Sequence, residues 1–194
     1  MIAGIVGLGL IGGSLAKAYK AGGAQVLAVD RDETVLSFAG LSGIVDDKLT
    51  KENISSCDVI LIAVYPKAAV AFMEEMAPHI GEGPVVIDCC GTKRIVCEAC
   101  FPLAEACGVT FVGGHPMAGT HKSGFKNADG DLFRGAPMVL VPPAFDNIHL
   151  LTRVKELLAP VGFGSISVTT AAAHDKMIAF SLSNSMISVR TDMF

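Results

Sequence analysis

The sequence has no stripe of basic residues, and its formal net charge of −4 is small for 194 residues. Binding of nucleic acid leaves a basic footprint on a protein, so its absence argues against that class of function. The sequence also lacks a long apolar segment, although 51% of its residues are hydrophobic. An uncharged run at residues 2–16 is interrupted by glycines and ends before Lys17, whereas a membrane helix needs about 20 predominantly apolar residues. No basic segment precedes this run, so we expect a cytoplasmic protein without a signal peptide or membrane partner.

The six cysteines lack the arrangement of a metal site. Cys97 and Cys100 have the two-residue gap of a zinc knuckle, but no second pair with ligand spacing follows. Cys107 comes seven residues later and has no histidine nearby. We therefore expect free, buried thiols in a reducing compartment, and no metal.

Short apolar runs alternate with helical segments along the chain, without an internal repeat or a low-complexity linker. The apolar runs are nearly continuous in Val, Ile, Leu and Ala, which is typical of parallel strands covered on both faces. Their order predicts an α/β protein with a doubly wound, mostly parallel sheet of the Rossmann type. Pro66 and Asp146 are suitable residues to begin the third and fifth helices. Strands are predicted at 2–6, 25–29, 58–64, 84–88, 109–112, 137–141 and 165–169, and helices near 13–21, 32–39, 67–77, 92–107 and 146–159.

A glycine-rich turn follows the first predicted strand and opens the first helix. Its glycines, Gly7, Gly9 and Gly12, have the G-x-G-x-x-G spacing, and the second strand ends in Asp30, eighteen residues after Gly12. In this context the glycines allow a tight turn, close approach to a pyrophosphate and close packing of the helix on the strand. Asp30 is expected to bind the adenine ribose, which favours NAD, while Arg31 leaves NADP open through its affinity for a phosphate.

Two later strand ends are expected to complete the cofactor site, because ligands bind outside the carboxyl ends of the strands in such sheets. One turn contains Val64 and Tyr65, and the other contains Gly91 and Thr92. Ordinary strand-to-helix turns are the alternative for either segment. The predicted cofactor-binding residues are Gly7, Gly9, Leu10, Ile11, Gly12, Asp30, Arg31, Val64, Tyr65 and Gly91.

Residues 113–125, GGHPMAGTHKSGF, place His115 in a glycine and proline setting at the carboxyl end of a predicted strand. A histidine held on such a turn can titrate or hydrogen-bond a substrate, so His115 is the candidate catalytic residue. A histidine that only caps a loop is the alternative.

Three segments of the chain resemble the signatures of the prephenate dehydrogenase family. They are GLGLIGGSL at residues 7–15, GHPMAGT at 114–120 and HDKMIAF at 174–180. The resemblance extends over about residues 2–180, and the Gly-His-Pro-x-Ala-Gly run is not shared with dinucleotide-binding folds in general. Differences occur at Thr92, which lies one position from a serine found in many members, and at His121, which replaces an acidic residue.

The resemblance implies NAD-dependent oxidative decarboxylation of prephenate to 4-hydroxyphenylpyruvate in tyrosine biosynthesis, or the corresponding reaction of arogenate. In the family, the histidine that matches His115 takes the proton of the ring hydroxyl. The resemblance also implies a small-molecule substrate and a homodimer. The residues implied in substrate binding are Thr92, Thr120, His121, Lys122 and His174.

The family continues into an all-helical domain that forms the dimer and contributes a substrate-binding arginine, but residues 181–194 do not resemble it. We therefore expect a dinucleotide-binding domain at 1–170 and a truncated start of the helical domain at 171–194. A cofactor-binding module without turnover is one alternative. A β-hydroxyacid dehydrogenase is another, but its lysine and asparagine lie four residues apart, whereas Lys176 and Asn184 lie eight apart. The tail is expected to self-associate through its apolar side chains, Met177, Ile178, Phe180, Leu182, Met186, Ile187 and Val189.

Overall fold

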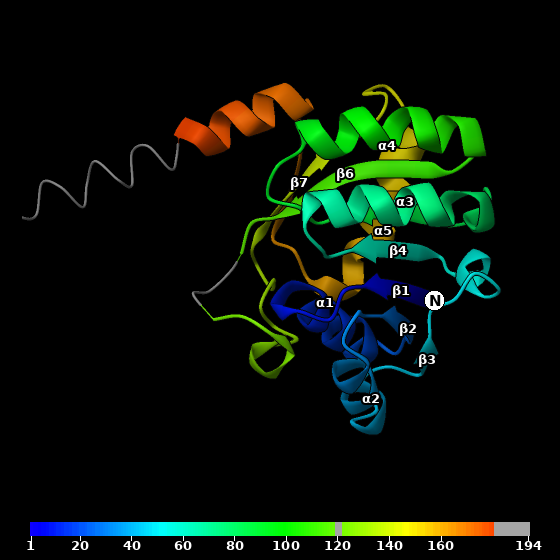
Figure 1. Cartoon of the computed structure of the whole chain (residues 1–194). Coiled ribbons are helices and arrows are strands. Elements are labelled where there is room, and N and C mark those ends of the chain that lie inside the picture. The colour runs from blue at the N-terminus through cyan, green and yellow to red at the C-terminus, as the bar shows by residue number, and fades with distance from the viewer. Residues whose placement is uncertain (119–121, 181–194) are drawn as a thin grey trace, which may run out of the picture.

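The computed structural model of the chain describes residues 1–118 and 122–180 (Figure 1). Strands and helices alternate along these residues, as predicted from the apolar runs. The strands are β1 (Ile2–Val6), β2 (Gln25–Val29), β3 (Asp47–Lys48), β4 (Val59–Ile62), β5 (Val85–Asp88), β6 (Thr110–Pro116), β7 (Pro137–Val141) and β8 (Ser165–Val168). The α-helices are α1 (Leu10–Ala21), α2 (Glu33–Leu41), α3 (Pro66–Ile80), α4 (Arg94–Cys107) and α5 (Ile148–Leu158), and residues 171–180 are also helical. Short 3₁₀ helices lie at Ile54–Ser56, Phe125–Asn127 and Ala159–Val161.

The strands form one sheet in the order β3-β2-β1-β4-β5-β6-β7-β8. All neighbouring strands are parallel except β6 and β7, which pair antiparallel. The chain reverses its direction of travel across the sheet between β1 and β4, and ligands bind beside the carboxyl ends of the strands at such a point. The predicted doubly wound, mostly parallel sheet is therefore confirmed.

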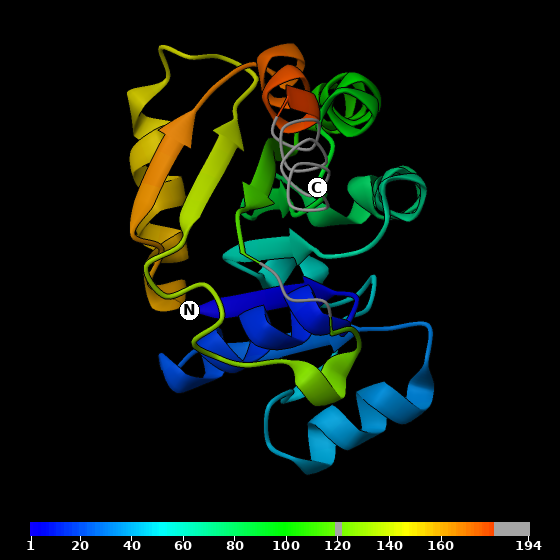
Figure 2. The ribbon, with the colours of Figure 1, turned by 90° about the vertical axis from the view of Figure 1, so that its left-hand side faces the viewer.

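Helices cover both faces of this sheet (Figures 1 and 2). Helices α1, α2 and α5 contribute to one apolar core, and α3 and α4 contribute to the other. The strands between them have almost no polar side chains because both of their faces are buried. Tyr19 of α1 fixes the packing of α5, because its buried hydroxyl donates to the Leu157 carbonyl oxygen at 2.8 Å.

Strand β6 is longer than predicted and includes His115. Residues 110–112 pair with β5, as expected, but Gly113–Pro116 continue as a strand and pair with β7, where His115 lies opposite Val139. The predicted turn at 113–116 is therefore wrong. Glycine is rare in strands, so the local sequence does not predict one here. The strand forms because the distant β7 supplies its hydrogen-bonding partner.

Smaller differences concern the ends of elements. The two-residue β3 was not predicted, because Asp47 and Lys48 are charged and exposed and only their pairing with β2 makes them a strand. Pro66 begins α3 as predicted, whereas α5 is capped by Asn147, whose side chain accepts from the Leu150 N–H at 3.0 Å, and not by Asp146. Helix α1 begins at Leu10, earlier than predicted, and includes Gly12 and Gly13.

The helical residues 171–180 lie beside the first turn of α4 (Figure 2). Within 1–118 and 122–180, no helix combines the length and apolar character needed to cross a membrane. The predicted substrate-binding residues Thr120 and His121, and the predicted apolar tail positions Leu182, Met186, Ile187 and Val189, lie outside the described residues.

Candidate active site

In the glycine-rich turn between β1 and α1, two glycines pack too tightly for a side chain and a third has free space beside it. Gly7 has a φ of +88°, and a Cβ there would lie 2.5 Å from Cγ1 of Val64. A Cβ on Gly12 would lie 1.8 Å from the Gly7 carbonyl oxygen, so only glycine allows α1 to approach the turn this closely. A Cβ on Gly9, in contrast, would meet no atom of the described chain within 4 Å.

Asp30, directly after β2, holds this turn in place. One oxygen of its carboxylate accepts from the Leu8 N–H at 2.5 Å, and the other accepts from the Asp32 N–H at 2.9 Å. Each carboxylate oxygen has two acceptor positions, so both oxygens retain capacity for a further hydrogen bond. The neighbouring Arg31 is exposed.

These residues fit the pyrophosphate and ribose of a dinucleotide. Gly9 is the N-cap residue of α1, no acidic residue lies in the first turn of the helix, and Leu10 and Ile11 follow in that turn. Backbone N–H groups at such a helix start bind phosphate, and the open side of Gly9 lets a ligand approach the backbone there. Asp30 lies at the end of the neighbouring strand, where a ribose hydroxyl is bound in this type of fold.

The other predicted cofactor residues lie at the carboxyl ends of β4 and β5. Val64 packs against Gly7 and accepts a hydrogen bond at its carbonyl oxygen from the Cys90 thiol at 3.2 Å. Tyr65 is the N-cap residue of α3, and its side chain is 85% exposed. Gly91 and Thr92 are exposed in the turn after β5.

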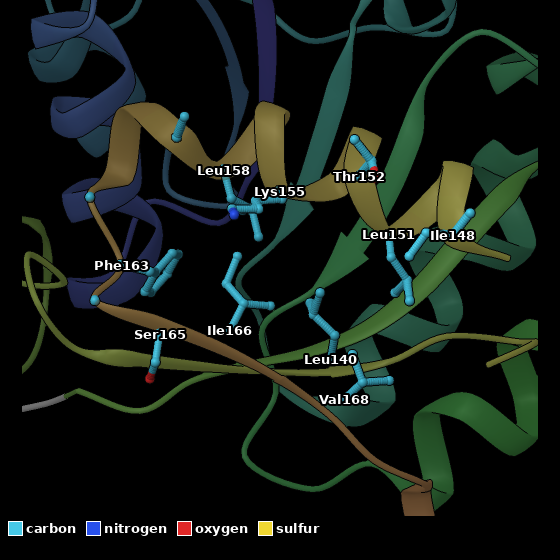
Figure 3. Close-up of a pocket in the computed structure, with 13 residues that line it drawn as sticks. Leu140, Ile148, Leu151, Thr152, Lys155, Leu158, Phe163, Ser165, Ile166 and Val168 are labelled. Carbon is cyan, nitrogen blue, oxygen red and sulfur yellow. The ribbon is translucent and has the colours of Figure 1, made fainter. Parts of the chain in front are cut away.

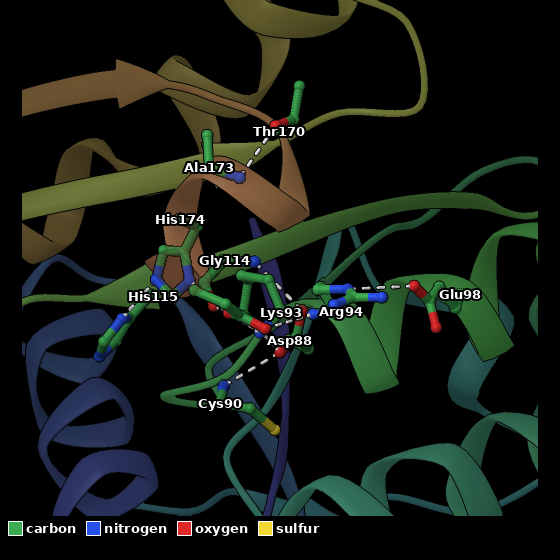
Figure 4. A network of polar contacts seen from close by, with 11 residues as sticks. Asp88, Cys90, Lys93, Arg94, Glu98, Gly114, His115, Thr170, Ala173 and His174 are labelled. Atoms are coloured by element: carbon green, nitrogen blue, oxygen red, sulfur yellow. Dashed lines mark hydrogen bonds and ion pairs between the residues drawn. The ribbon is translucent and has the colours of Figure 1, made fainter. Parts of the chain in front are cut away.

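A buried ion pair ties this turn to β6 (Figure 4). The ammonium group of Lys93 donates both to the Asp88 carboxylate and to the Gly114 carbonyl oxygen, and neither charged side chain has exposed surface. Asp88 also accepts from the backbone N–H groups of Cys90 at 3.0 Å and Gly114 at 3.1 Å. Both polar backbone groups of Gly114 are therefore fixed, which holds the residue before His115 in place.

His115 belongs to a chain of hydrogen bonds that ends at a carboxylate (Figure 4). Its Nδ1 lies 2.8 Å from Nε2 of His174, and Nδ1 of His174 lies 2.8 Å from Oδ1 of Asp175. The Asp175 carboxylate also accepts from the backbone N–H groups of Lys93 at 2.7 Å and Arg94 at 3.0 Å, where α4 begins. The other ring nitrogen of His115, Nε2, points toward the turn after β5, because a Cβ on Gly91 would lie 3.8 Å from it.

The surroundings of His115 keep its ring neutral at pH 7. Burial is the main cause, and His174 and Lys93 act in the same direction, so the pKa of His115 falls to about 4 against an opposing effect of Asp175. Burial raises the pKa of Asp175, but hydrogen bonds from His174 and from the Lys93 and Arg94 backbone outweigh it and lower the pKa overall. The site thus places a neutral imidazole at the sheet edge and an ionised carboxylate behind it.

His174 does not have the role predicted for it. Its side chain is fully buried, and both of its ring nitrogens already bond to protein groups, His115 and Asp175. It therefore has no nitrogen left to bind a substrate directly, and the prediction of direct contact is corrected.

Sequence reasoning missed Asp88, Lys93 and Asp175. Asp88 and Lys93 carried a usable signal, since a carboxylate that ends an apolar strand is buried with it and needs a cation nearby. Asp175 follows His174 in the sequence, but its contact with the start of α4 depends on the docking of a distant helix. Lys122, a predicted substrate-binding residue, is exposed.

The cysteines form no metal site in the part of the chain that the structure describes, where no group of three or more His, Cys, Asp or Glu side chains could hold an ion. Cys57, Cys90, Cys97 and Cys100 are free and buried, as predicted, and Cys89 and Cys107 are free and partly buried. Burial raises the pKa of the Cys90, Cys97 and Cys100 thiols to about 12, so they remain protonated at neutral pH.

A hollow of about 460 Å³ lies between α5 and β8, away from these groups (Figure 3). Among the described residues its lining is mostly apolar, with Leu140, Leu151 and Ile166 facing it and Lys155 as the only charged side chain. None of the predicted site residues within 1–118 and 122–180 lines this hollow, and we assign no chemistry to it.

Comparison with known proteins places this site in a family. Residues 15–167 match the family described as "Prephenate dehydrogenase, nucleotide-binding domain". The prephenate dehydrogenase of Lactococcus lactis subsp. cremoris is 33% identical over 177 residues, which are 89% of this chain and 48% of the relative. The chain spans about half the length of the curated relatives it matches, with shares from 43% to 60%.

Two solved structures have the same fold. Synechocystis arogenate dehydrogenase is 30% identical with a TM-score of 0.82, over 92% of this chain and 63% of that one. Prephenate dehydrogenase from A. aeolicus, in complex with hydroxyphenyl propionate and NAD⁺, is 25% identical with a TM-score of 0.78, over 97% and 70%. The family match covers more than half of the sequence and includes His115, Lys93 and Asp88. The chain therefore belongs to the prephenate dehydrogenase family and contains its nucleotide-binding domain.

Proposed function

We propose that this chain is the NAD-binding and proton-accepting part of a dehydrogenase that oxidises prephenate to 4-hydroxyphenylpyruvate with loss of CO₂. The observation that carries the proposal is the neutral His115 ring at the carboxyl edge of the sheet, where its Nε2 faces the turn at Gly91. A neutral imidazole at that place can accept a proton from a substrate hydroxyl.

Cofactor binding is assigned to the residues predicted from the sequence. We propose that Gly7, Gly9 and Gly12 hold the pyrophosphate and that Asp30 binds the adenine ribose. When bound, NAD⁺ accepts a hydride from the ring carbon that bears the hydroxyl. Asp30 favours NAD⁺ because its carboxylate repels the additional phosphate of NADP⁺, and the exposed Arg31 is the residue that would pair with that phosphate if NADP⁺ bound.

The protein residues have complementary roles in the proposed reaction. His115 takes the hydroxyl proton as a carbonyl develops on the ring, and the clamp of Asp88 and Lys93 on Gly114 limits the movement of His115. Orientation of this kind is a large part of enzymatic rate enhancement. Thr92, Thr120, His121 and Lys122 remain our candidates for substrate contacts.

Arogenate is the alternative substrate, and one observation favours it. The relative from Synechocystis is an arogenate dehydrogenase, and its structure is similar to this chain over 92% of the sequence. The relative from A. aeolicus is a prephenate dehydrogenase bound to hydroxyphenyl propionate and NAD⁺. Both substrates carry the ring hydroxyl that His115 would deprotonate, so the same site serves either one.

We also propose that residues 1–170 form the cofactor domain and that residue 171 begins a helical unit through which the protein forms a homodimer in the cytoplasm. Exposed apolar side chains on this helix support self-association, since Met177 is 47% exposed and Phe180 is 69% exposed.

The first experiment combines NAD⁺ binding and turnover on the same sample. Calorimetry measures binding of NAD⁺ and NADP⁺, and NADH absorbance measures turnover with prephenate or arogenate. The His115→Asn variant removes the proton acceptor while leaving the glycine-rich turn intact, so we expect unchanged NAD⁺ affinity and a turnover reduced by about 10²–10⁴-fold.

Each part of the proposal has its own contrary result. An unchanged turnover in His115→Asn would exclude this histidine as the proton acceptor. Binding of NAD⁺ without any turnover by the unmodified chain would establish a cofactor-binding module instead of an enzyme. Absence of NAD⁺ binding would overturn the proposal as a whole.

A further inference from the structure

The two ring nitrogens of His115 have different surroundings, and the difference originates at Asp175. Asp175 Oδ1 lies 2.8 Å from Nδ1 of His174, and Nε2 of His174 lies 2.8 Å from Nδ1 of His115. His174 is fully buried, so water does not compete for either of its nitrogens. The three side chains therefore form a chain of hydrogen bonds, which we call the series, from the Asp175 carboxylate through His174 to the ring of His115.

The position of each proton follows from the acceptor at the end of this series. An ionised carboxylate has only acceptor oxygens, so Nδ1 of His174 carries the proton in the hydrogen bond to Asp175. When His174 is neutral, its Nε2 is then an acceptor, and Nδ1 of His115 has to be the donor. In a neutral His115 this leaves the lone pair on Nε2, the nitrogen that faces the turn at Gly91.

Backbone contacts hold both ends of the series at the same turn of the chain. Helix α4 has no side-chain cap from its own N-cap residue and no acidic residue in its first turn. Asp175 takes that place from a distant helix, because its carboxylate accepts from the Lys93 and Arg94 N–H groups. The same segment clamps Gly114 through the Lys93 side chain, so Asp175 and His115 are fixed to one support.

We propose that Asp175 and His174 are positioning residues for His115, which hold its ring in the tautomer that has the proton on Nδ1 and the lone pair on Nε2. The tautomer is inferred from the hydrogen bonds alone. Only its catalytic meaning rests on the proposed function, in which Nε2 needs a lone pair to accept a proton. It also gives the helix 171–180 a part in the site without any contact with the substrate. When Nε2 takes a proton, both hydrogen bonds of the series remain, and the carboxylate faces the new positive charge through His174.

The titratable groups around His115 come from three parts of the chain. His174 and Asp175 come from the helix 171–180, Lys93 comes from the turn before α4, and Asp88 comes from β5. Burial, His174 and Lys93 lower the pKa of His115 to about 4, and Asp175 raises it.

Nitrogen NMR of the histidine rings tests the inference without substrate or turnover. The full chain is labelled with ¹⁵N-histidine, and spectra are recorded at about pH 8, above the ordinary imidazole range. The His115→Asn variant identifies the signals of His115 by their loss. We expect a protonated Nδ1 and an unprotonated Nε2 in the unmodified chain, and the reverse as the major form in His174→Leu, which removes the acceptor.

The Asp175→Asn variant is a second test that keeps the size of the side chain, in case His174→Leu does not fold. It should give a mixture of both tautomers of His115. Asp32→Asn is the matched control, because Asp32 caps α2 through the Thr34 and Val35 N–H groups but contacts neither histidine. We expect this control to retain the tautomer of the unmodified chain.

A protonated Nε2 in the unmodified chain would overturn the inference, and so would an unchanged His115 spectrum in folded Asp175→Asn or His174→Leu. The expected spectra in a chain that shows no turnover would leave the inference standing while the proposed function fails. Where turnover is measurable, Asp175→Asn should lower kcat by about 10²-fold with little change in KM, the lower part of the range for a general base.

Discussion

Lys93 and Asp88 form an ion pair without exposed surface at the end of β5. Removing two charges from water is costly, and their mutual attraction compensates for this only when hydrogen bonds satisfy the remaining polar atoms. That condition is met here, since Asp88 accepts from two backbone N–H groups and Lys93 also donates to the Gly114 carbonyl oxygen. The pair serves to fix β6 beside the turn, and either partner alone would be an uncompensated buried charge.

The Lys93→Met variant should therefore lose about 3–5 kcal/mol of unfolding free energy, because Asp88 would remain buried without its cation. Urea denaturation measures the loss. Lys48→Met is the matched control, since Lys48 forms an exposed ion pair with Glu33 at 2.6 Å, and such pairs contribute about 1 kcal/mol or less. Similar losses of unfolding free energy in the two variants would show that burial of the ion pair does not determine how much Lys93 contributes to stability.

Individual residues were predictable from the sequence to the extent that their neighbours in the chain define them. His115 was singled out by the glycine and proline around it, and Asp30 was identified by its distance from the glycine-rich turn. Lys93 and Asp88 were missed because their role is to bind the backbone of Gly114, which lies on another strand. The contact between His115 and His174 links residues 59 positions apart, so no local pattern could indicate it.

Glycines in the connection between β1 and α1 serve two purposes. Gly12 allows tight packing, and Gly9 leaves space for a ligand. Gly9→Ala adds a methyl group where the described chain has no atom within 4 Å, so we expect the unfolding free energy to change by about 1 kcal/mol or less. The same methyl group would occupy the space that a pyrophosphate needs, and NAD⁺ affinity should fall at least about tenfold, or about 1.4 kcal/mol. Calorimetry and thermal unfolding of the same variant provide the two measurements.

Two further variants provide the contrast. Gly12→Ala has no room for its Cβ beside the Gly7 carbonyl oxygen and should lose about 1–3 kcal/mol or more of stability. Gly40→Ala, in the last turn of α2, meets nothing closer than 4.0 Å and should gain about 0.5–1 kcal/mol with NAD⁺ affinity unchanged. If Gly9→Ala bound NAD⁺ as tightly as Gly40→Ala, the turn would not be the pyrophosphate site.

Elements were predictable where their own sequence decides them. The strands β1, β2, β4 and β5 are continuous apolar runs, and both of their faces are buried. The extension of β6 through His115 could not be predicted, because its glycines are poor strand residues and its hydrogen bonds come from β7. The start of α4 at Arg94 is likewise set by groups from elsewhere, above all the Asp175 carboxylate.

The arrangement of the whole molecule was predictable because it follows from general rules of parallel sheets. Alternating strands and helices give a sheet covered on both faces, and the ligand site then lies where the order of strands reverses. The docking of the helix 171–180 against α4 does not follow from these rules. Asp175 contributes to it through the Lys93 and Arg94 N–H groups, and His174 of the same helix contacts His115 on β6, while Phe180 stays 69% exposed.

Self-association through the helix 171–180 is a property of the molecule as a whole. If a second copy covers Phe180, burial of that side chain contributes about 1.5–3 kcal/mol, and Phe180→Glu should weaken the dimer about ten- to a hundredfold. Sedimentation equilibrium over a range of concentrations measures the dissociation constant. Phe145→Glu is the control, since Phe145 is 53% exposed in the loop before α5 and lies outside this helix. A monomer at all concentrations, or equal weakening by both substitutions, would exclude the helix as the interface, because Phe180 lies on this helix and Phe145 does not.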